Sequence, residues 1–447
     1  MISTKFNLSS KHKISDFKKI IQVDPDKSIS IRSFIISSIS QNISYIKNVL
    51  ESDDVLSTIN CLKKLGVRIK KIKPRNYVVY GTGIGSLHIK KNSLLNFGNS
   101  GTLARLLIGV LSTTPNIEVK MLGDKSLNKR SMKSLIELMS KYGASFLPKN
   151  KSNFPLKLIS SPMPVGIKYS AGVSAQLKSA VILAGLNSYG TTTIFEHKKS
   201  RDHTEKMLFQ NKDTIKIKHL KRKIIEVTGK KNLNPLSIRI PNDPSSAAFF
   251  TALTLLKKKS SIKIKNTCLN ETRIGFYNLL KKHGAKIKFK NLKKKNNEVS
   301  GDIIVKSSKL KPIKASKSYY VNSTDEYPIL FVIASLIEGV SVFKGIEDLA
   351  NKESNRIIEM QKILRQLGIK SIAKKNSIKI YGTKNININK KILVPSLGDH
   401  RICMSAFILA VLTGVNTKIF NFETVFSSSP SFLKIMKKLG AKFEKRY

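Results

Sequence analysis

Six segments of this chain share one pattern, a polar start followed by a long apolar run, and they recur at intervals of about seventy to eighty-five residues. Runs of this kind are too apolar to remain in contact with water. We therefore expect six buried helices, one in each repeat of a larger unit. They open at DKSISIRSFIISSI (from Asp26), NSGTLARLLIGVL (Asn99), SAQLKSAVILAGL (Ser174), DPSSAAFFTALTLL (Asp243), DEYPILFVIASLI (Asp325) and GDHRICMSAFILAVL (Gly398).

A second helix is predicted in each repeat, and in five of the six it is followed by a glycine. Glycine just past the last turn is what a left-handed helix cap requires. The sixth copy, SRDHTEKMLFQNKD (from Ser200), has Asn211 near the expected glycine. The other five segments are LKKLGVRI (from Leu62), MSKYGASF (Met139), LLKKHGAKI (Leu279), LRQLGIKS (Leu364) and MKKLGAKF (Met436).

Short segments between the helices alternate polar and apolar residues, which is typical of β-strands. Each repeat then consists of strand, helix, strand, helix and a strand pair. The pattern predicts an α/β protein with two lobes of three βαβαββ repeats, inner helices and outer sheets. Pro235 in NLNPLS separates the third repeat from the fourth. We expect one discontinuous lobe to comprise residues 1–21 and 236–447 (repeats four to six) and the other residues 22–235 (repeats one to three).

The charge of the chain is strongly basic, with 81 Lys and Arg residues against 28 Asp and Glu residues and a formal net charge of +53. A charge of this size is ordinarily typical of proteins that bind nucleic acid or another polyanion. Here the lysines are spread over every segment, whereas Phe and Tyr fall mostly in apolar runs. We interpret the excess as a compositional bias at solvated positions, without a specific nucleic-acid surface.

Several classes of protein are disfavoured by what the sequence lacks. No uncharged apolar stretch approaches the roughly 20 residues that cross a bilayer, and the first residues have no apolar signal-peptide core. Cys61, Cys268 and Cys403 are far apart and have no metal-ligand spacing. We expect a cytoplasmic protein with buried free thiols, no disulfide, no metal and no organic cofactor.

The starts of the six apolar helices are candidate anion-binding sites. A helix N-terminus presents unpaired N–H groups and the positive end of the helix dipole. Several of the six starts also carry Lys, Arg, Ser or Asn. Any one of them could be a solvated or capped helix end. Gathered in one place, they predict a site for more than one phosphate or carboxylate.

Eight segments that follow one another across nearly the whole chain are DKSISIR, GNSGTLAR, SAGVSAQLKSA, SRDHTEKM, PNDPSSAAFF, DEYPIL, KESNRI and GDHRICMS. In this order they resemble the 5-enolpyruvylshikimate-3-phosphate synthases, and SAQLKSA, SRDHT and DEYP are more similar to the second class of that family than to the first. The resemblance implies two lobes with the active site in the cleft between them. It also implies transfer of the enolpyruvyl group of phosphoenolpyruvate to the 5-hydroxyl of shikimate 3-phosphate, with release of phosphate, in the shikimate pathway.

The resemblance implies substrate contacts for residues in these segments. Arginine is suited to such contacts because its planar guanidinium group can donate two hydrogen bonds to one carboxylate or phosphate. The residues expected to bind shikimate 3-phosphate are Lys27, Ser28, Arg32, Ser174, Ala175, Gln176, Arg201, Asp325 and Lys352. Those expected to bind phosphoenolpyruvate are Lys27, Asn99, Gly101, Arg130, Gln176, Arg356 and Arg401.

Three of these positions are expected to be catalytic: Lys27, Asp325 and Glu353. By resemblance, the aspartate accepts the proton of the substrate hydroxyl and the glutamate lies near the methylene carbon. Glu326 is an alternative acid, because neighbours on a helix point about 100° apart. His400 is a candidate assistant. Gly101 is the small residue that the family associates with inhibition by glyphosate.

Two other functions remain open. UDP-N-acetylglucosamine enolpyruvyl transferases share the fold but use a cysteine on a mobile loop, and none of the three cysteines lies in such a loop. A non-catalytic basic nucleic-acid-binding protein would carry basic and aromatic residues on one face. The expected partners are the two small substrates, with no specific nucleic acid, no membrane and a monomeric chain.

Overall fold

The computed structural model describes residues 4–220 and 222–447. The chain divides into two compact units, which we call unit 1 (Met1–Asp24, Pro241–Lys295 and Val299–Tyr447) and unit 2 (Pro25–Ile240 and Asn296–Glu298). The crossings at 24/25 and 240/241 fall a few residues after the expected 21/22 and 235/236. The second crossing is later because β14 (Ser237–Arg239) pairs with β3 (Ile43–Lys47) of unit 2.

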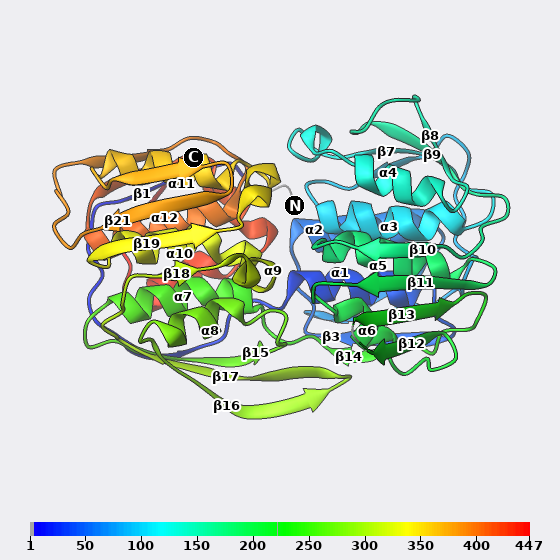
Figure 1. The fold of residues 1–447 in the computed structure, drawn as a ribbon, viewed down its shortest axis with the longest axis horizontal. Coiled ribbons are helices and arrows are strands. Elements are labelled where there is room, and N and C mark those ends of the chain that lie inside the picture. The colour runs from blue at the N-terminus through cyan, green and yellow to red at the C-terminus, as the bar shows by residue number, and fades with distance from the viewer. Residues whose placement is uncertain (1–3, 221) are drawn as a thin grey trace. The chain divides into compact units, whose positions relative to one another are not determined.

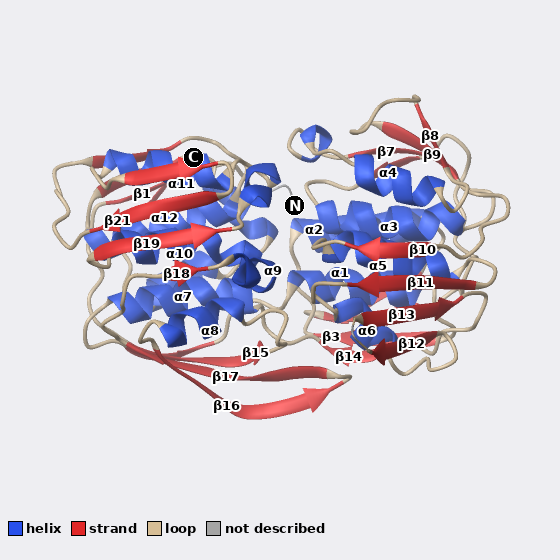
Figure 2. Cartoon of the chain, in the orientation of Figure 1, coloured by secondary structure: helices blue, strands red, loops and turns tan. Residues whose placement is uncertain are grey.

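Unit 2 is built on three inner helices, α1 (Lys27–Ser38), α3 (Gly101–Thr113) and α5 (Ala175–Leu186), whose side chains are almost all buried. Figures 1 and 2 show these helices with strands outside them. The second helices of the repeats are α2 (Asp53–Lys64), α4 (Lys133–Ser140) and α6 (His203–Leu208). The sheets have the orders β14-β3-β5-β4, β6-β7-β9-β8 and β10-β11-β13-β12. The remaining strands are β4 (Arg68–Lys73), β5 (Asn76–Tyr80), β6 (Leu94–Asn96), β7 (Glu118–Leu122), β8 (Ser145–Leu147), β9 (Leu156–Ile159), β10 (Lys168–Ala171), β11 (Thr191–Glu196), β12 (Ile215–His219) and β13 (Lys223–Thr228).

Unit 1 has the same plan, with inner helices α7 (Pro244–Leu256), α10 (Tyr327–Ser335) and α12 (His400–Thr413). The second helices of its repeats are α8 (Gly275–Lys282), α11 (Arg356–Gln366) and α13 (Phe432–Lys438), and the short helix α9 (Tyr320–Ser323) precedes α10. The sheets have the orders β16-β17-β15-β2, β18-β19-β21-β20 and β22-β23-β1-β24. Their strands are β1 (Asn7–Ser10), β2 (Lys18–Ile21), β15 (Ser261–Cys268), β16 (Lys286–Lys295), β17 (Glu298–Lys306), β18 (Lys314–Ala315), β19 (Gly339–Lys344), β20 (Ser371–Lys374), β21 (Ser377–Gly382), β22 (Lys391–Val394), β23 (Asn416–Ile419) and β24 (Glu444–Arg446).

One topology recurs in the six four-stranded sheets that the described residues form. An end strand pairs in parallel with its neighbour, and that neighbour pairs antiparallel with the next strand. A parallel pair needs a crossover, which a helix supplies, whereas an antiparallel pair needs only a turn. The predicted α/β fold of repeated strand, helix and strand-pair units is confirmed.

The glycines predicted to end the second helices have the expected left-handed backbone, with φ between 75° and 96° at Gly66, Gly143, Gly284, Gly368 and Gly440. The prediction for the sixth copy is wrong in detail. Helix α6 ends at Leu208, and Asn211 does not have a positive φ. Instead its side chain donates to the carbonyl of Leu208 (3.3 Å) and accepts from the backbone N–H of Asn234 (2.8 Å).

Within residues 4–220 and 222–447, no helix has the length and apolar character needed to cross a membrane. In the same residues, no group of three or more His, Cys, Asp or Glu side chains is arranged to hold a metal ion. Cys61, Cys268 and Cys403 are free and buried, as the sequence predicted. Burial raises the pKa of Cys61 to about 12 and also raises the pKa of Cys403.

The packing of α3 against α5 makes Gly109 a testable position. A Cβ atom there would lie 2.6–3.0 Å from backbone atoms of Ala180. Alanine adds about 1 kcal/mol of helix propensity, but overpacking a rigid contact costs about 1–3 kcal/mol. We therefore expect Gly109→Ala to lower the free energy of unfolding, measured in urea by circular dichroism. Gly172→Ala is the control, because a Cβ there meets nothing within 4 Å; equal stability of the two variants would contradict this account.

Candidate active site

Each inner helix of unit 2 starts at a capped turn that bears candidate residues. The side chains of Asp26, Ser100 and Ser174 accept hydrogen bonds from backbone N–H groups one turn into α1, α3 and α5. These caps satisfy one N–H group each and leave others in the first turn for a ligand. The candidates Lys27, Ser28, Gly101 and Ala175 lie in or beside these first turns, with Asn99 just before the cap of α3.

The two cationic candidates of α1 are held differently. The Nζ atom of Lys27 lies 2.8 Å from Oδ2 of Asp54, in the first turn of α2. Arg32 is buried one turn further along α1, where its Nε donates to Oγ1 of Thr204 (3.0 Å) and its Nη2 to Oγ of Ser179 (3.3 Å). These two hydroxyl groups fix the position of the Arg32 guanidinium.

A hydrogen-bonded chain joins the starts of α3 and α5. Gln176 accepts from Nη1 of Arg105 (2.9 Å) and donates to Oγ1 of Thr102 (3.0 Å). Arg130 donates to Oδ1 of Asn99 and to Oγ of Ser126 (3.2 Å). Gly101 lies between the two arginines, because a Cβ at this position would be 2.7 Å from Nη1 of Arg105 and 3.2 Å from Nη1 of Arg130.

Unit 1 gathers its candidates around one buried guanidinium, that of Arg356 at the first position of α11. Its Nε donates to Oδ2 of Asp399 (2.9 Å), its Nη2 donates to Oε2 of Glu353 (2.6 Å), and its Nη1 lies 3.7 Å from Oδ1 of Asp325. Burial alone would lower the pKa of Arg356, but Asp399, Glu353 and Asp325 outweigh it and raise that pKa. The two candidate catalytic carboxylates are therefore held on one cation.

The environments of Asp325 and Glu326 differ. The side chain of Asp325 is 25% exposed, whereas Glu326 is 1% exposed. After burial, Glu326 is the main cause of the raised pKa of Tyr277, so its carboxylate lies toward the core of unit 1. This geometry favours Asp325 over the alternative acid Glu326.

Lys352 and Arg401 complete the candidates of unit 1. Nζ of Lys352 is 2.6 Å from Oδ2 of Asp348, which also accepts from the hydroxyl of Tyr320 (2.8 Å). Arg401 is buried at the start of α12, with its guanidinium carbon 5.9 Å from the ring centroid of Phe249. Among the described residues, its Nε and Nη1 atoms make no hydrogen bond. His400 is buried beside it.

The structure adds residues to which the sequence reasoning assigned no substrate contact: Asp54, Arg105, Asp348 and Asp399. Asp399 accepts from the backbone N–H of Arg401 (3.0 Å) and so caps α12 while it binds Arg356. An aspartate just before an apolar run predicts a helix N-cap, so the capping role of Asp399 could be predicted from the sequence. The pairing of Asp54 with Lys27 could not be predicted from the sequence, because the two residues lie on different helices.

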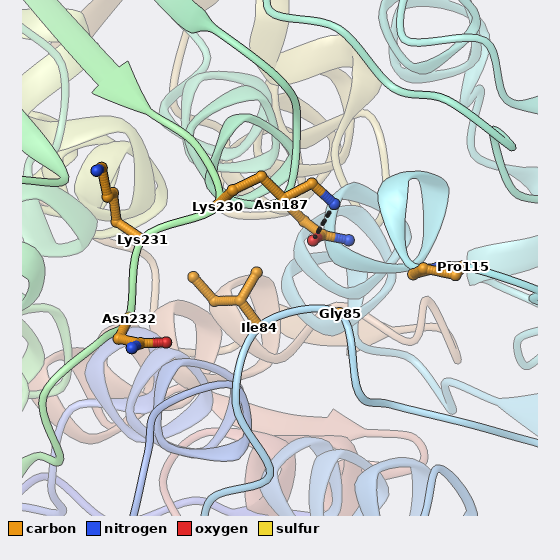
Figure 3. A pocket seen from close by; sticks show the side chains of 7 residues that line it. All are labelled: Ile84, Gly85, Pro115, Asn187, Lys230, Lys231 and Asn232. Carbon is orange, nitrogen blue, oxygen red and sulfur yellow. Dashed lines mark hydrogen bonds between the residues drawn. The ribbon is translucent and has the colours of Figure 1, made fainter.

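A cavity of about 220 Å³ in unit 2 is separate from these residues. It lies where α3 and α5 end, lined by residues that include Pro115, Asn187 and Lys230, and Figure 3 shows the hydrogen bond from Lys230 to Asn187 (3.0 Å). The candidates Gly101, Ala175 and Gln176 lie at the other ends of the same helices, roughly 20 Å away at 1.5 Å per residue. The cavity is therefore not part of the candidate site.

The Arg356 cluster predicts a stability effect. Arg356→Met would leave the buried carboxylate of Asp399 without its cation, and we expect it to lower the free energy of unfolding by about 3–5 kcal/mol. In the double variant Arg356→Met/Asp399→Asn the buried charge of Asp399 is removed while Asn still caps the helix. Part of the lost free energy of unfolding should therefore be recovered. Urea unfolding followed by circular dichroism measures both values. A loss below about 1 kcal/mol in the single variant, or no recovery in the double, would contradict the interpretation.

Comparisons of the sequence and of the structure with known proteins point to the same family. The family model of EPSP synthase (3-phosphoshikimate 1-carboxyvinyltransferase) matches residues 11–436. Proteins named 3-phosphoshikimate 1-carboxyvinyltransferase from Thermodesulfovibrio yellowstonii and Bacillus subtilis are 39% and 36% identical over 96% and 94% of this chain, and 98% and 97% of their own. A solved structure of EPSP synthase from Acinetobacter baumannii superimposes with a TM-score of 0.85 and 31% identity, covering 99% of this chain and 100% of that one. The chain therefore belongs to the EPSP synthase family.

Proposed function

We propose that the protein transfers the enolpyruvyl group of phosphoenolpyruvate to the 5-hydroxyl of shikimate 3-phosphate and releases phosphate. The observation that carries the proposal is the guanidinium of Arg401, which is 4% exposed and whose Nε and Nη1 atoms have no hydrogen-bond partner among the described residues. Buried guanidinium nitrogens that make no hydrogen bond are costly unless an anion binds them. Membership of the family makes phosphoenolpyruvate the anion.

The substrates bring two phosphates and a carboxylate, and the candidate residues supply cations for each. In the proposal, shikimate 3-phosphate binds the start of α1, the start of α5 and the loop that carries Arg201. Phosphoenolpyruvate binds Arg130, Arg356 and Arg401, with Lys27 and Gln176 contacting both substrates. Because these residues come from both units, we propose that both units contribute to one site.

The proposed chemistry is an addition followed by an elimination. The hydroxyl oxygen of shikimate 3-phosphate attacks the enol carbon of phosphoenolpyruvate, and the methylene carbon takes up a proton. Asp325 accepts the hydroxyl proton, and Glu353 exchanges the proton of the methylene carbon. The adduct then loses that proton and its phosphate group, which restores the double bond. Lys27 and the arginines stabilise the charge that develops on the oxygens.

Two alternative functions are disfavoured by what the described residues show. A UDP-N-acetylglucosamine enolpyruvyl transferase would need a reactive cysteine, but all three cysteines are buried and the raised pKa of Cys61 and Cys403 keeps these thiols protonated. A nucleic-acid-binding protein would expose aromatic side chains for stacking, whereas most phenylalanines of this chain are buried in the core.

We further propose that the chain acts as a cytoplasmic monomer without a cofactor. The substrates are small, and each candidate contact named above comes from this chain. Size-exclusion chromatography with light scattering, with and without both substrates, tests the oligomeric state; a stable dimer would contradict this part of the proposal.

Phosphate release is the first prediction of the proposed function. Wild type should release phosphate only when both substrates are present, and not when UDP-N-acetylglucosamine replaces shikimate 3-phosphate. Lys27→Ala should lower kcat/KM by about 100-fold or more, because it removes a cation that acts on developing charge. Glu353→Gln should lower kcat by about 100-fold or more, because the amide cannot exchange a proton.

Matched controls separate these effects from a general loss of charge. Lys218→Ala removes a more exposed lysine that is paired with Glu226 in unit 2. Glu359→Gln removes a carboxylate that pairs with Lys362 on α11, one turn beyond Arg356. Both controls should keep nearly full activity. Wild type that releases no phosphate from the two substrates would refute the proposed function.

Inhibition by glyphosate is the second prediction. Wild type should be inhibited in competition with phosphoenolpyruvate. Gly101→Ala should be less sensitive, with a raised KM for phosphoenolpyruvate, because the added Cβ would displace the guanidinium groups of Arg105 and Arg130. Steady-state kinetics of wild type, Gly101→Ala and the control Gly172→Ala measure this. Wild-type activity that is unaffected by millimolar glyphosate would contradict it.

A further inference from the structure

A buried ionic cluster lies behind the phosphate-binding candidates of unit 2. Nζ of Lys178, on α5, lies 2.6 Å from Oε1 of Glu196 and 2.7 Å from Oε1 of Glu205. Lys223 adds a second ammonium, 3.2 Å from each carboxylate. The side chains of Lys178, Glu196 and Glu205 are at most 1% exposed. No residue of this cluster is among the candidates for substrate contact.

The cluster joins three elements of the chain. Lys178 lies on the second turn of α5, Glu196 is the last residue of β11, and Glu205 lies on α6. Between β11 and α6 runs a loop of six residues, 197–202, that carries Arg201. The α5, β11 and α6 labels in Figure 1 show these elements in unit 2.

Glu196 also fixes the loop itself. Its Oε1 atom accepts hydrogen bonds from the backbone N–H (3.0 Å) and the hydroxyl (2.7 Å) of Ser200, the residue before Arg201. Burial alone would raise the pKa of Glu196, but Lys178, Lys223 and Ser200 lower it to about 2. The carboxylate is therefore ionised at neutral pH and holds the base of Arg201.

The neighbours of the cluster in the chain hold Arg32. Ser179 follows Lys178 on α5, and Thr204 precedes Glu205 on α6. Their hydroxyl groups are 2.8 Å apart, and both accept hydrogen bonds from Arg32. Any change in the spacing of α5 and α6 would move both hydroxyls and with them the guanidinium of Arg32.

The energetics favour a role in geometry over a role in stability. A buried ion cluster of this kind is often no more stable than apolar side chains of the same volume, because removing the charges from water is costly. What ionic contacts do provide is a defined distance and direction, since each donor and acceptor must be satisfied. Methionine would fill the site of Lys178 on this apolar helix without fixing α6.

We propose that Lys178 is a positioning residue for shikimate 3-phosphate: through Glu196 and Glu205 it fixes the loop that carries Arg201 and the hydroxyl groups that hold Arg32. This inference rests on the proposed function, because it assigns a substrate to those two arginines. The inference makes the binding of shikimate 3-phosphate depend on a buried residue that does not contact the substrate.

The test is the steady-state kinetics of Lys178→Met with each substrate varied in turn. We expect the KM for shikimate 3-phosphate to rise about tenfold or more, while the KM for phosphoenolpyruvate and kcat change less than about threefold. Titration calorimetry with shikimate 3-phosphate alone should show the same loss of affinity. In an Arg201→Ala background, Lys178→Met should raise that KM by a clearly smaller factor, because one of the residues it positions is already absent.

Ile182→Ala is the matched control, since Ile182 is fully buried one turn further along α5 and removing its side chain costs about 2–5 kcal/mol. It should lower the melting temperature but leave the KM for shikimate 3-phosphate unchanged. If Lys178→Met does not fold, Glu205→Gln removes one carboxylate of the cluster and should raise the same KM. An unchanged KM for shikimate 3-phosphate, or an equal rise in Ile182→Ala, would overturn the inference. Inactive wild type would instead refute the proposed function itself.

Discussion

Burial of the inner helices is the constraint on which the rest of this structure depends. These helices are buried on nearly every side, so they are stable only when strands and other helices cover them. Their N-terminal turns carry the polar residues, and the caps Asp26, Ser100 and Ser174 hold those turns in unit 2. The same burial that drives folding thus fixes the direction in which the N–H groups of each helix point.

Acidic residues are scarce in this chain, 28 against 81 basic ones, and their placement is informative. Arg356 alone contacts Asp325, Glu353 and Asp399, and Lys178 contacts two further glutamates. Most lysines, by contrast, lie at solvated positions where a nearby carboxylate would contribute little free energy. The buried carboxylates therefore mark the places where a cation has a fixed position in the fold.

The sequence was sufficient for the features that depend on local pattern. The apolar runs located the inner helices, and the glycines after the second helices had the predicted left-handed backbone. Pattern failed at Asn211, where a side-chain hydrogen bond replaces the cap, and at residues 236–240, which stay with unit 2 because β14 pairs with a strand almost two hundred residues earlier. The candidate residues came from motifs, but their partners Asp54 and Asp399 depend on contacts between different helices, which no local pattern encodes.

The discontinuity of unit 1 has a consequence for biosynthesis. Strand β1 is made first, yet Leu8 lies between Ile419 and Lys445, near the end of the chain. Unit 2 apart from its three-residue segment Asn296–Glu298 is complete once Ile240 has been translated, whereas β1 must wait for the last strands. At about 5–20 residues per second this delay is roughly 10–40 s for the second half of the chain. During that interval both edges of β1 lack their partners β23 and β24, and an unpaired strand edge is a template for pairing with other chains.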